Sequence, residues 1–318
     1  MNVHLTFDIE VWCNGWNNLD SEFPEYFDRY VFGRSRHGEY ALPKTLEILN
    51  QYGLKGIFFV EPLFAARFGI EHLQTIVRMI REAGQEVQLH IHPEWTDEIS
   101  PPILANITKK RQHLTYYTLE EQTALIAFAK LLLERSGSGP ISAFRAGSFA
   151  ANGDTFCALS NNGIYHDSSL NRCYPISAPD LRRKHEFISP FSENGVTTFP
   201  VTVFTDGFGY ERPAQIGACS SREMRDALLS ALSIGLTDFV LLSHNFEMLK
   251  PDTSEPDNIV IRRFQDLCMF LAENREALSV SSYADQSPIS TPTCKLPKAN
   301  IVSTCTRHLE QLVRRLVY

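Results

Sequence analysis

Apolar and polar positions in residues 3–283 follow two periods that alternate along the chain. Short apolar runs and alternations of period two predict strands, whereas apolar residues three or four apart predict helices. The predicted strands are 3–9, 55–60, 86–92, 141–148 with its turn, 164–166, 196–204, 239–243 and 278–282. The predicted helices are 43–52, 71–83, 118–135, 154–161, 220–234 and 257–272. This rhythm predicts an α/β fold of parallel strands joined by right-handed crossovers.

Two of the predicted helices begin with a capping box. Thr118 precedes Glu121 by three residues, and Ser220 precedes Glu223 in the same way. In this pattern the hydroxyl and the carboxylate each accept a hydrogen bond from a backbone amide at the start of the helix. We therefore expect both helices to begin at these residues.

The segment from Trp12 to Pro43 lies outside the alternation. It is long, aromatic and irregular, and loops of this length in compact domains are commonly lids or binding loops. Trp12 and Trp16 offer flat faces that suit sugar rings, but aromatic residues also pack into small satellite cores. The sequence leaves both interpretations open.

The end of the chain differs in composition from the rest. Residues 286–300 are rich in Ser, Thr and Pro, which predicts a linker, and residues 301–318 predict an amphipathic helix. From residue 286 onward the chain has five Lys or Arg residues and one Glu. A basic amphipathic helix can lie on an anionic membrane, although docking on its own domain or on a second subunit is favoured for so short a stripe. The predicted domains are 1–285, 286–300 and 301–318.

Composition narrows the class of protein. The chain has 318 residues, of which 43% are hydrophobic and 21% charged, as in an ordinary globular protein. Its 30 basic and 37 acidic residues give a net charge of −7, which argues against a nucleic-acid partner. Its seven scattered Cys predict reduced, independent thiols, and an amino terminus without a basic or long apolar run predicts a cytoplasmic protein.

The strongest chemical signal is the pair His90 and His92. These two imidazoles alternate with apolar residues, so both point to the same side of a predicted strand that ends at Pro93. Asp8 and Glu10 likewise share one side at the end of the first strand. Two neighbouring imidazoles and a carboxylate are the donor set of a catalytic zinc site with an open position.

Other polar residues follow later strands. Arg145, Asp167 and His244 each stand at the carboxyl end of a predicted strand. Any one of them is expected by chance as a salt bridge or a capped strand end. A barrel, however, gathers all its strand ends at one mouth, so the recurrence favours a single metal-dependent site.

These residues together resemble a known family. Thr6-Phe7-Asp8, residues 53–60, residues 86–93, Phe144-Arg145-Ala146-Gly147, Asp167 and Leu242-Ser243-His244 occur in the order of the motifs of polysaccharide deacetylases (NodB-like, carbohydrate esterase family 4). The resemblance covers about residues 3–283. Its closest likeness is to the WalW-like branch, which is associated with lipopolysaccharide or surface-polysaccharide synthesis.

The resemblance implies a distorted (β/α)7-type barrel that binds a divalent metal, usually zinc. It implies that Asp8 is the general base and that His90 and His92 are metal ligands. Arg145 would orient Asp8, and Asp167 would hold His244, the general acid. A backbone amide at Gly147 would help to stabilise the oxyanion, and Trp12, Trp16 and Trp95 are candidates for contact with the substrate.

Two features depart from the family pattern. The usual pair of adjacent aspartates is replaced by Asp8-Ile9-Glu10, so the carboxylate ligand would be Glu10. The usual histidine pair has three residues between its members, whereas only Ile91 separates His90 from His92. If the short spacing spoils the ligand geometry, the protein would be a pseudoenzyme.

The first hypothesis is a hydrolase of carbon–nitrogen bonds other than peptide bonds. It would remove acetyl groups, N-acetyl before O-acetyl, from a sugar or cell-envelope glycan precursor. The alternatives are a cyclic amide or imide hydrolase of the same superfamily and a non-catalytic glycan-binding module. Acetate release separates the first from the second, and metal content separates both from the third.

Overall fold

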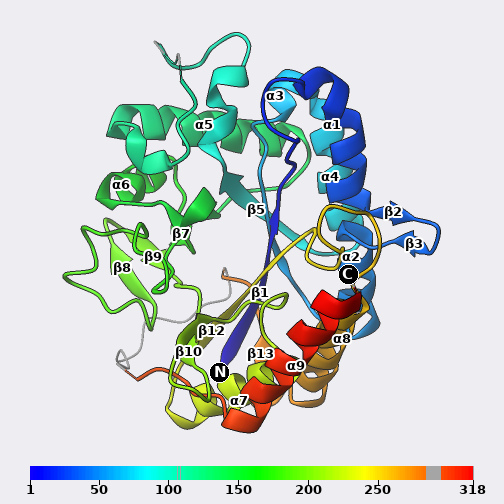
Figure 1. The fold of residues 1–318 in the computed structure, drawn as a ribbon. Coiled ribbons are helices and arrows are strands. Elements are labelled where there is room, and N and C mark those ends of the chain that lie inside the picture. The colour runs from blue at the N-terminus through cyan, green and yellow to red at the C-terminus, as the bar shows by residue number, and fades with distance from the viewer. Residues whose placement is uncertain (106, 108, 284–294, 318) are drawn as a thin grey trace. The chain divides into compact units, whose positions relative to one another are not determined.

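The structure is a computed structural model that describes residues 1–105, 107, 109–283 and 295–317. It divides into two compact units, and Figure 1 labels the helices and strands of both. Unit 1 comprises Met1–Gly56, Val203–Ser281 and Lys295–Tyr318, and unit 2 comprises Ile57–Thr202 and Ser282–Cys294. The predicted linker, residues 286–300, lies largely outside the described residues.

Unit 1 is built on parallel strands. β1 (Asn2–Ile9) lies between β12 (Asp238–His244) and β13 (Ser279–Val280), and is parallel to both. Apart from half-buried Asn2, every residue of β1 is buried, although polar and apolar residues alternate along it. The buried polar side chains have partners: His4 contacts Asp238, and Thr6 donates to the carbonyl of Leu241. The register pairs Asp8 with His244, so two of the predicted site residues are neighbours at the carboxyl ends of adjacent strands.

Helices complete unit 1. They are α2 (Leu42–Gln51), α7 (Ser221–Ser233), α8 (Asn258–Glu273) and α9 (Ile301–Val317). The predicted capping box is confirmed at α7, where Ser220 and Glu223 each accept the backbone amide of the other. Two short antiparallel pairs, β2 (Arg34–Ser35) with β3 (Gly38–Glu39) and β10 (Val203–Thr205) with β11 (Glu211–Pro213), also belong to this unit.

The segment Trp12 to Pro43 is more ordered than the sequence predicted. It contains α1 (Leu19–Phe27) and a π-helical turn (Asp28–Phe32). Leu19, Phe23 and Phe27 are buried at a spacing of four, which is a helical period. Pro24 and the short length of the helix hid this period, so the prediction of an irregular loop was wrong over these residues.

Unit 2 contains a sheet with the order β4-β5-β6-β7-β9-β8. Its parallel strands are β4 (Ile57–Val60), β5 (Glu86–Ile91), β6 (Ala143–Ala146), β7 (His166–Asp167) and β9 (Val196–Thr198), and β8 (Phe191–Glu193) pairs antiparallel with β9. Its helices are α3 (Ala65–Phe68), α4 (Ile70–Glu82), α5 (Leu119–Arg135) and α6 (Gly153–Asn161), with short 3-10 turns at Pro93–Glu98, Leu114–Tyr116 and Gly147–Phe149. The capping box predicted at Thr118 is confirmed.

The single strand predicted for 196–204 is two strands. β9 ends at Thr198 in unit 2, and β10 begins at Val203 in unit 1. Pro200 lies between them and has no amide hydrogen to donate to a ladder, which explains the interruption.

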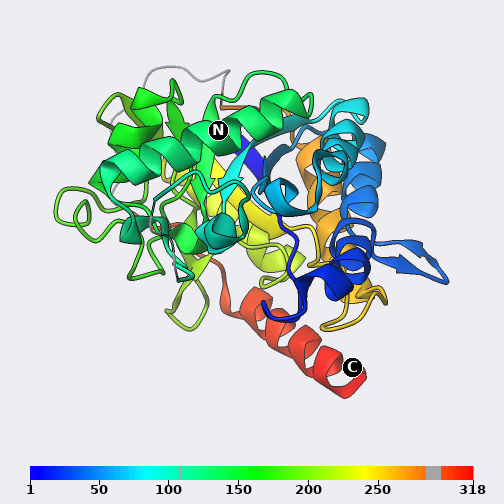
Figure 2. The ribbon, with the colours of Figure 1, turned by 90° about the horizontal axis from the view of Figure 1, so that it is seen from above.

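The helix predicted at the end of the chain is present as α9, but its orientation is unexpected. Its polar face contacts unit 1, where buried Arg307 forms ion pairs with Glu223 at 3.0 Å and with Asp206 at 2.8 Å. The apolar stripe faces outward instead, with Leu309 62% and Leu316 76% exposed. Figure 1 shows α9 beside α7, and Figure 2 shows it in red, ending at the C-terminus. Helices long and apolar enough to span a bilayer are absent from the described residues.

Candidate active site

The ends of β1 and β12 bring an acid, a second acid and an imidazole together in unit 1. The Nε2 atom of His244 lies 4.0 Å from Oδ2 of Asp8. Ligand atoms of Asp8, Glu10 and His244 all lie within 4.8 Å of one another. Asp8 and Glu10 are buried, and His244 is partly exposed. The cluster therefore combines two potential proton acceptors with one potential proton donor.

Glu247 holds the other side of the His244 ring. The Nδ1 atom of His244 lies 2.8 Å from Oε1 of Glu247. The same carboxylate accepts hydrogen bonds from Nε2 of Gln215 and from the amide of Gly217, both at 2.6 Å, and from Oγ of Ser243 at 3.2 Å. A carboxylate with four partners is fixed in position, and so is the ring bonded to it.

This environment changes the acidity of His244. Burial lowers the pKa of the imidazole, but the hydrogen bond to Glu247 and the negative charges of Glu10, Glu247 and Asp8 outweigh it. Together they raise the pKa to about 9. The ring is therefore protonated at neutral pH in the metal-free chain, as a group that donates a proton must be.

The sequence had assigned the role of holding His244 to Asp167, and this was wrong. Asp167 accepts hydrogen bonds from the amide and Oγ of Ser169 and from Oγ1 of Thr198, all within unit 2. Burial raises the pKa of Asp167 above its usual range, although these hydrogen bonds and the charge of Arg145 oppose the rise. Glu247 takes the place at His244 because it follows three residues later on the same loop.

Glu10 is held by its neighbours in unit 1. Nε1 of Trp12 donates to Oε2 of Glu10 at 2.7 Å, and the side chain of Asn245 bonds both the amide and the carbonyl of Glu10, at 3.2 and 3.1 Å. Trp12 packs edge-on against Trp16, with ring centroids 6.2 Å apart. Trp12 thus orients a carboxylate, a role that the sequence did not suggest.

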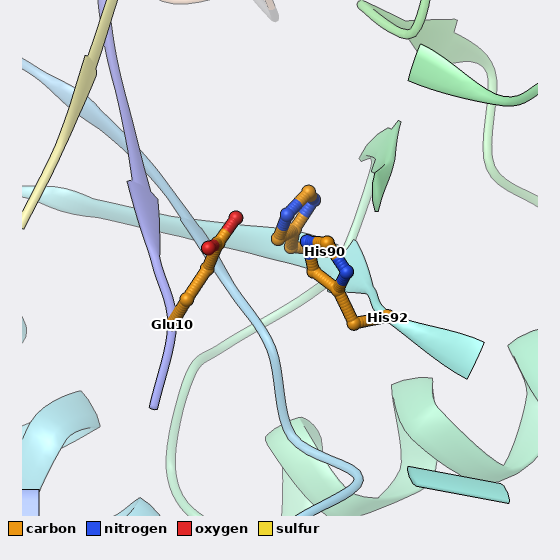
Figure 3. Close-up of side chains that lie close together, drawn as sticks. All are labelled: Glu10, His90 and His92. Carbon is orange, nitrogen blue, oxygen red and sulfur yellow. The ribbon is translucent and has the colours of Figure 1, made fainter. Parts of the chain in front are cut away.

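In unit 2, the two imidazoles predicted as ligands lie at the end of β5. Nδ1 of His90 lies 2.7 Å from the carbonyl oxygen of Arg145, and Nδ1 of His92 lies 3.3 Å from Oε2 of Glu94. A carbonyl oxygen can only accept, so Nδ1 of His90 carries a hydrogen, and in the neutral ring Nε2 has the lone pair. Hydrogen bonds of this kind fix the tautomer of metal-binding histidines. Figure 3 draws both rings, and each can offer one nitrogen to a metal.

Two residues of β6 and its turn position these imidazoles. A Cβ added at Gly147 would lie 2.7 Å from Nδ1 and Cε1 of His92, so only glycine fits against the ring without displacing it. Buried Arg145 donates through Nε to the carbonyl of Ser168 and through Nη2 to its hydroxyl, at 3.1 and 2.9 Å. The roles predicted for Arg145 towards Asp8 and for the Gly147 amide towards an oxyanion stay predictions.

Trp95 does not lie on a substrate-facing surface. Its side chain is 1% exposed, and its ring packs edge-on against Phe64 and Phe68, with centroids 6.5 and 6.1 Å away. The sequence prediction of a substrate contact was wrong because it could not know that α3 covers this ring.

Sequence reasoning missed two carboxylates of the site. Glu247 and Glu94 each bond the Nδ1 atom of a predicted site histidine, and each follows its histidine closely in the chain. The spacings, His92-Pro93-Glu94 and His244-Asn245-Phe246-Glu247, were visible. An acid two or three residues after a strand-end histidine is the signal that could have found them.

Comparisons with known proteins support the fold. No protein-family model matches the sequence, and no curated protein sequence does so. A Mycobacterium smegmatis protein provisionally named a polysaccharide deacetylase is structurally similar, with 16% identity, a TM-score of 0.53 and coverage of 93% of this chain and 94% of that one.

Two further solved structures are more distant. A family 4 carbohydrate esterase from Streptomyces lividans, in complex with acetate, has 14% identity, a TM-score of 0.44 and coverage of 92% and 98%. A family 4 acetyl xylan esterase from Clostridium thermocellum, with cobalt, has 12% identity, a TM-score of 0.42 and coverage of 90% and 89%. The similarity to the M. smegmatis structure confirms the predicted fold class: the chain has the α/β fold of polysaccharide deacetylases, a distorted (β/α)7-type barrel.

Proposed function

We propose that this protein is a metal-dependent hydrolase that removes acetyl groups from an N-acetylated sugar or cell-envelope glycan precursor. The observation that carries the proposal is the His244–Glu247 pair beside Asp8, which joins a protonated imidazole to a buried carboxylate. Hydrolysis of an amide needs both functions, because water must lose a proton and the departing amine must gain one. The polysaccharide deacetylase fold agrees with this chemistry.

The donor set fits a divalent metal. Glu10, His90 and His92 would be its ligands, with the two imidazoles binding through Nε2, and zinc is the first candidate because it favours nitrogen with oxygen ligands. The hydrogen bond from Nδ1 of His90 to the carbonyl of Arg145 already selects the required tautomer. A bound metal would supply Lewis-acid polarisation of the acetyl carbonyl and an acidic water.

The residues of the chain then have distinct tasks. Asp8 takes a proton from the attacking water, and Arg145 keeps its predicted role of orienting this carboxylate. Water adds to the acetyl carbonyl, so a C–O bond forms and the carbonyl oxygen becomes an oxyanion. The carbonyl then re-forms as the C–N bond of the acetamide breaks. His244 gives its proton to the leaving nitrogen, so the products are acetate and an amino sugar. Glu247 stabilises the protonated ring before the transfer and fixes its direction.

Acetate release tests this proposal directly. Full-length protein, first stripped with a chelator and then supplied with zinc or cobalt, is incubated with an N-acetylglucosamine oligomer. Asp8→Asn and His244→Ala should each lower the rate by about 10²-fold or more, the usual loss for a general base or acid. Asp20→Asn, a change on the exposed side of α1, is the matched control and should retain the rate.

Other outcomes contradict the proposal. Metal-independent release, or equal rates in wild type and Asp8→Asn, would exclude the mechanism. Ring opening of a cyclic imide without acetate from any acetylated sugar would point to the alternative hydrolase. Sugar binding without metal and without turnover would favour a glycan-binding module.

A further inference from the structure

A cavity in unit 1 opens beside the proposed general acid. It has a volume of about 470 Å³, and both His244 and Glu247 line it. This volume is in the range of pockets that bind small ligands. The cavity therefore extends the site beyond the reacting atoms. Its lining residues indicate which chemical groups the rest of a substrate could carry.

One part of the wall is aromatic. Tyr30 and Phe246 line the cavity, and their rings meet edge-on with centroids 5.2 Å apart. Phe246 also stacks against His244, with centroids 5.3 Å apart and planes inclined by 27°. Aromatic faces of this kind suit the apolar face of a sugar ring.

Another part of the wall is cationic. Arg29, Lys250 and Arg314 line the cavity, and they come from three separate segments: the π-helical turn, the loop after β12 and α9. Arg29 lies over the rings of Tyr26 and Tyr30, 5.7 and 5.6 Å from their centroids, which orients its guanidinium. Three cations from separate segments therefore line one cavity, although the protein has a net charge of −7.

The carboxylates nearby cancel this charge only in part, because Arg314 pairs with buried Asp257 and Arg29 with Asp252. Glu247 already has four hydrogen-bond partners, one of them His244. Asp252 lies 3.5 Å from Arg29, but it is fully exposed to solvent, where ion pairs are weak. Among the described residues, Arg314 donates to Asp257 at 2.7 Å through Nε, which leaves the two Nη groups for a further acceptor.

We propose that this cavity binds an acidic group, a carboxylate or a phosphate, on the sugar whose acetyl group is removed. The inference rests on the proposed function for the identity of the ligand as a sugar. The aromatic wall takes the ring, and Arg314 with Arg29 takes the anion, because guanidinium groups pair with carboxylate and phosphate oxygens. α9 thereby contributes to substrate choice, although its apolar stripe faces solvent.

The test uses three sugars that differ at one position. N-acetylglucosamine, its 6-phosphate and N-acetylglucosaminuronic acid carry a hydroxyl, a phosphate and a carboxylate in the same place. Binding to full-length protein is measured by isothermal titration calorimetry, which does not depend on turnover. At least one acidic sugar should bind about tenfold or more tightly than the neutral one, as expected for a charge-assisted contact. The preferred acid identifies the group.

Substitutions locate the contact. Arg314→Gln and Arg29→Gln should each remove most of the preference for the acidic sugar and change binding of the neutral sugar by less than about twofold. Arg315→Gln is the matched control, because this arginine is exposed on the same helix and does not line the cavity. Equal binding of all three sugars, no measurable binding of either acidic sugar, or equal effects of Arg314→Gln and Arg315→Gln would overturn the inference.

The two proposals fail separately. Acetate is measured in the same samples after zinc is added. Tight, Arg314-dependent binding of an acidic sugar without acetate release would sustain the acidic subsite and count against the hydrolase. Acetate release at equal rates from all three sugars, with no difference in binding, would sustain the hydrolase and overturn the subsite.

Discussion

His244 of unit 1 and His90 of unit 2 differ in the partner of Nδ1. In unit 1, His244 bonds a carboxylate that three other groups also hold. In unit 2, His90 bonds a neutral backbone carbonyl at 2.7 Å. The first partner adds negative charge beside the ring, whereas the second only directs the hydrogen to Nδ1.

This difference separates two kinds of chemistry. A carboxylate stabilises the imidazolium, so His244 keeps its proton until the proton is transferred to the leaving nitrogen. A carbonyl fixes the neutral tautomer, so His90 offers a lone pair at Nε2. Between His244 and His90, the hydrogen-bond partner thus separates a proposed acid from a proposed ligand. His92 combines the two features, because it is a proposed ligand whose Nδ1 lies 3.3 Å from the Glu94 carboxylate.

The largest expected effect is the loss of metal from unit 2 variants. His90→Ala and His92→Ala should each lower zinc affinity by about 100-fold or more, because a three-ligand site retains little affinity with two ligands. His37→Ala, at an exposed position, should retain metal. Elemental analysis after gel filtration gives the result, and metal retained in both site variants would exclude these ligands.

The second prediction concerns the acidity of His244. In metal-free protein, Glu247→Gln should lower the pKa of His244 from about 9 by about two units, because the main raising influence is gone while burial remains. NMR of the labelled imidazole measures it. The raised pKa contributes stability that is present below the ordinary value of 6.5 and is lost as pH rises through about 9. Glu273→Gln on α8 is the control, and an unchanged titration in Glu247→Gln would break the comparison.

Local patterns explain how much of this site the sequence predicted. β1, β5 and β12 were found because each carries its own period, and the capping box at Ser220 was found because its two members lie three residues apart. The positions of Asp8, His90 and His244 at strand ends follow from these elements alone. The elements and strand-end residues that depend on nearby sequence were therefore predictable.

The other features depended on distant segments. The spacing from His244 to Glu247 is local, but Gln215 and Gly217, from another loop, fix the orientation of the Glu247 carboxylate. Trp95 is buried because α3 lies over it. The orientation of α9 follows from Asp206 and Glu223, which attract buried Arg307 and turn the apolar stripe outward. No period in the local sequence carries such information.

The third prediction concerns Glu61, a buried carboxyl of unit 2. Glu61 accepts hydrogen bonds from the amides of Leu63 and Phe64, but burial outweighs them and raises its pKa to about 8. Between the ordinary value of 4.5 and about 8 the folded chain binds a proton that the unfolded chain has released, so stability falls as pH rises.

Glu61→Gln removes this titration. The free energy of unfolding of metal-free protein is measured in urea at about pH 5 and about pH 8. It should fall between these pH values in wild type, and the fall should be smaller in Glu61→Gln by on the order of 2 kcal/mol. Glu82→Gln, an exposed change on α4, should follow wild type. Parallel pH curves for wild type and Glu61→Gln would show that this carboxyl is ionised in the folded chain.

The smallest expected effects come from two glycines, and they test the comparison most sharply. A Cβ at Gly147 would lie 2.7 Å from the His92 ring, and a Cβ at Gly217 would lie 2.4 Å from Oε2 of Glu247. Neither glycine has a positive φ, so alanine acts at both sites through contact alone. Gly147→Ala should weaken zinc binding by about tenfold through the displaced ring and leave the pKa of His244 unchanged.

Gly217→Ala should do the reverse. Displacement of the Glu247 carboxylate weakens its bond to His244, so the pKa of His244 falls while zinc affinity stays within about twofold of wild type. Each variant is the control for the other, since both add one methyl group beside a site residue. If both variants weakened zinc binding and lowered the pKa of His244 together, the ligand and acid functions would not be separable by residue. The distinction between the two histidine environments would then be wrong.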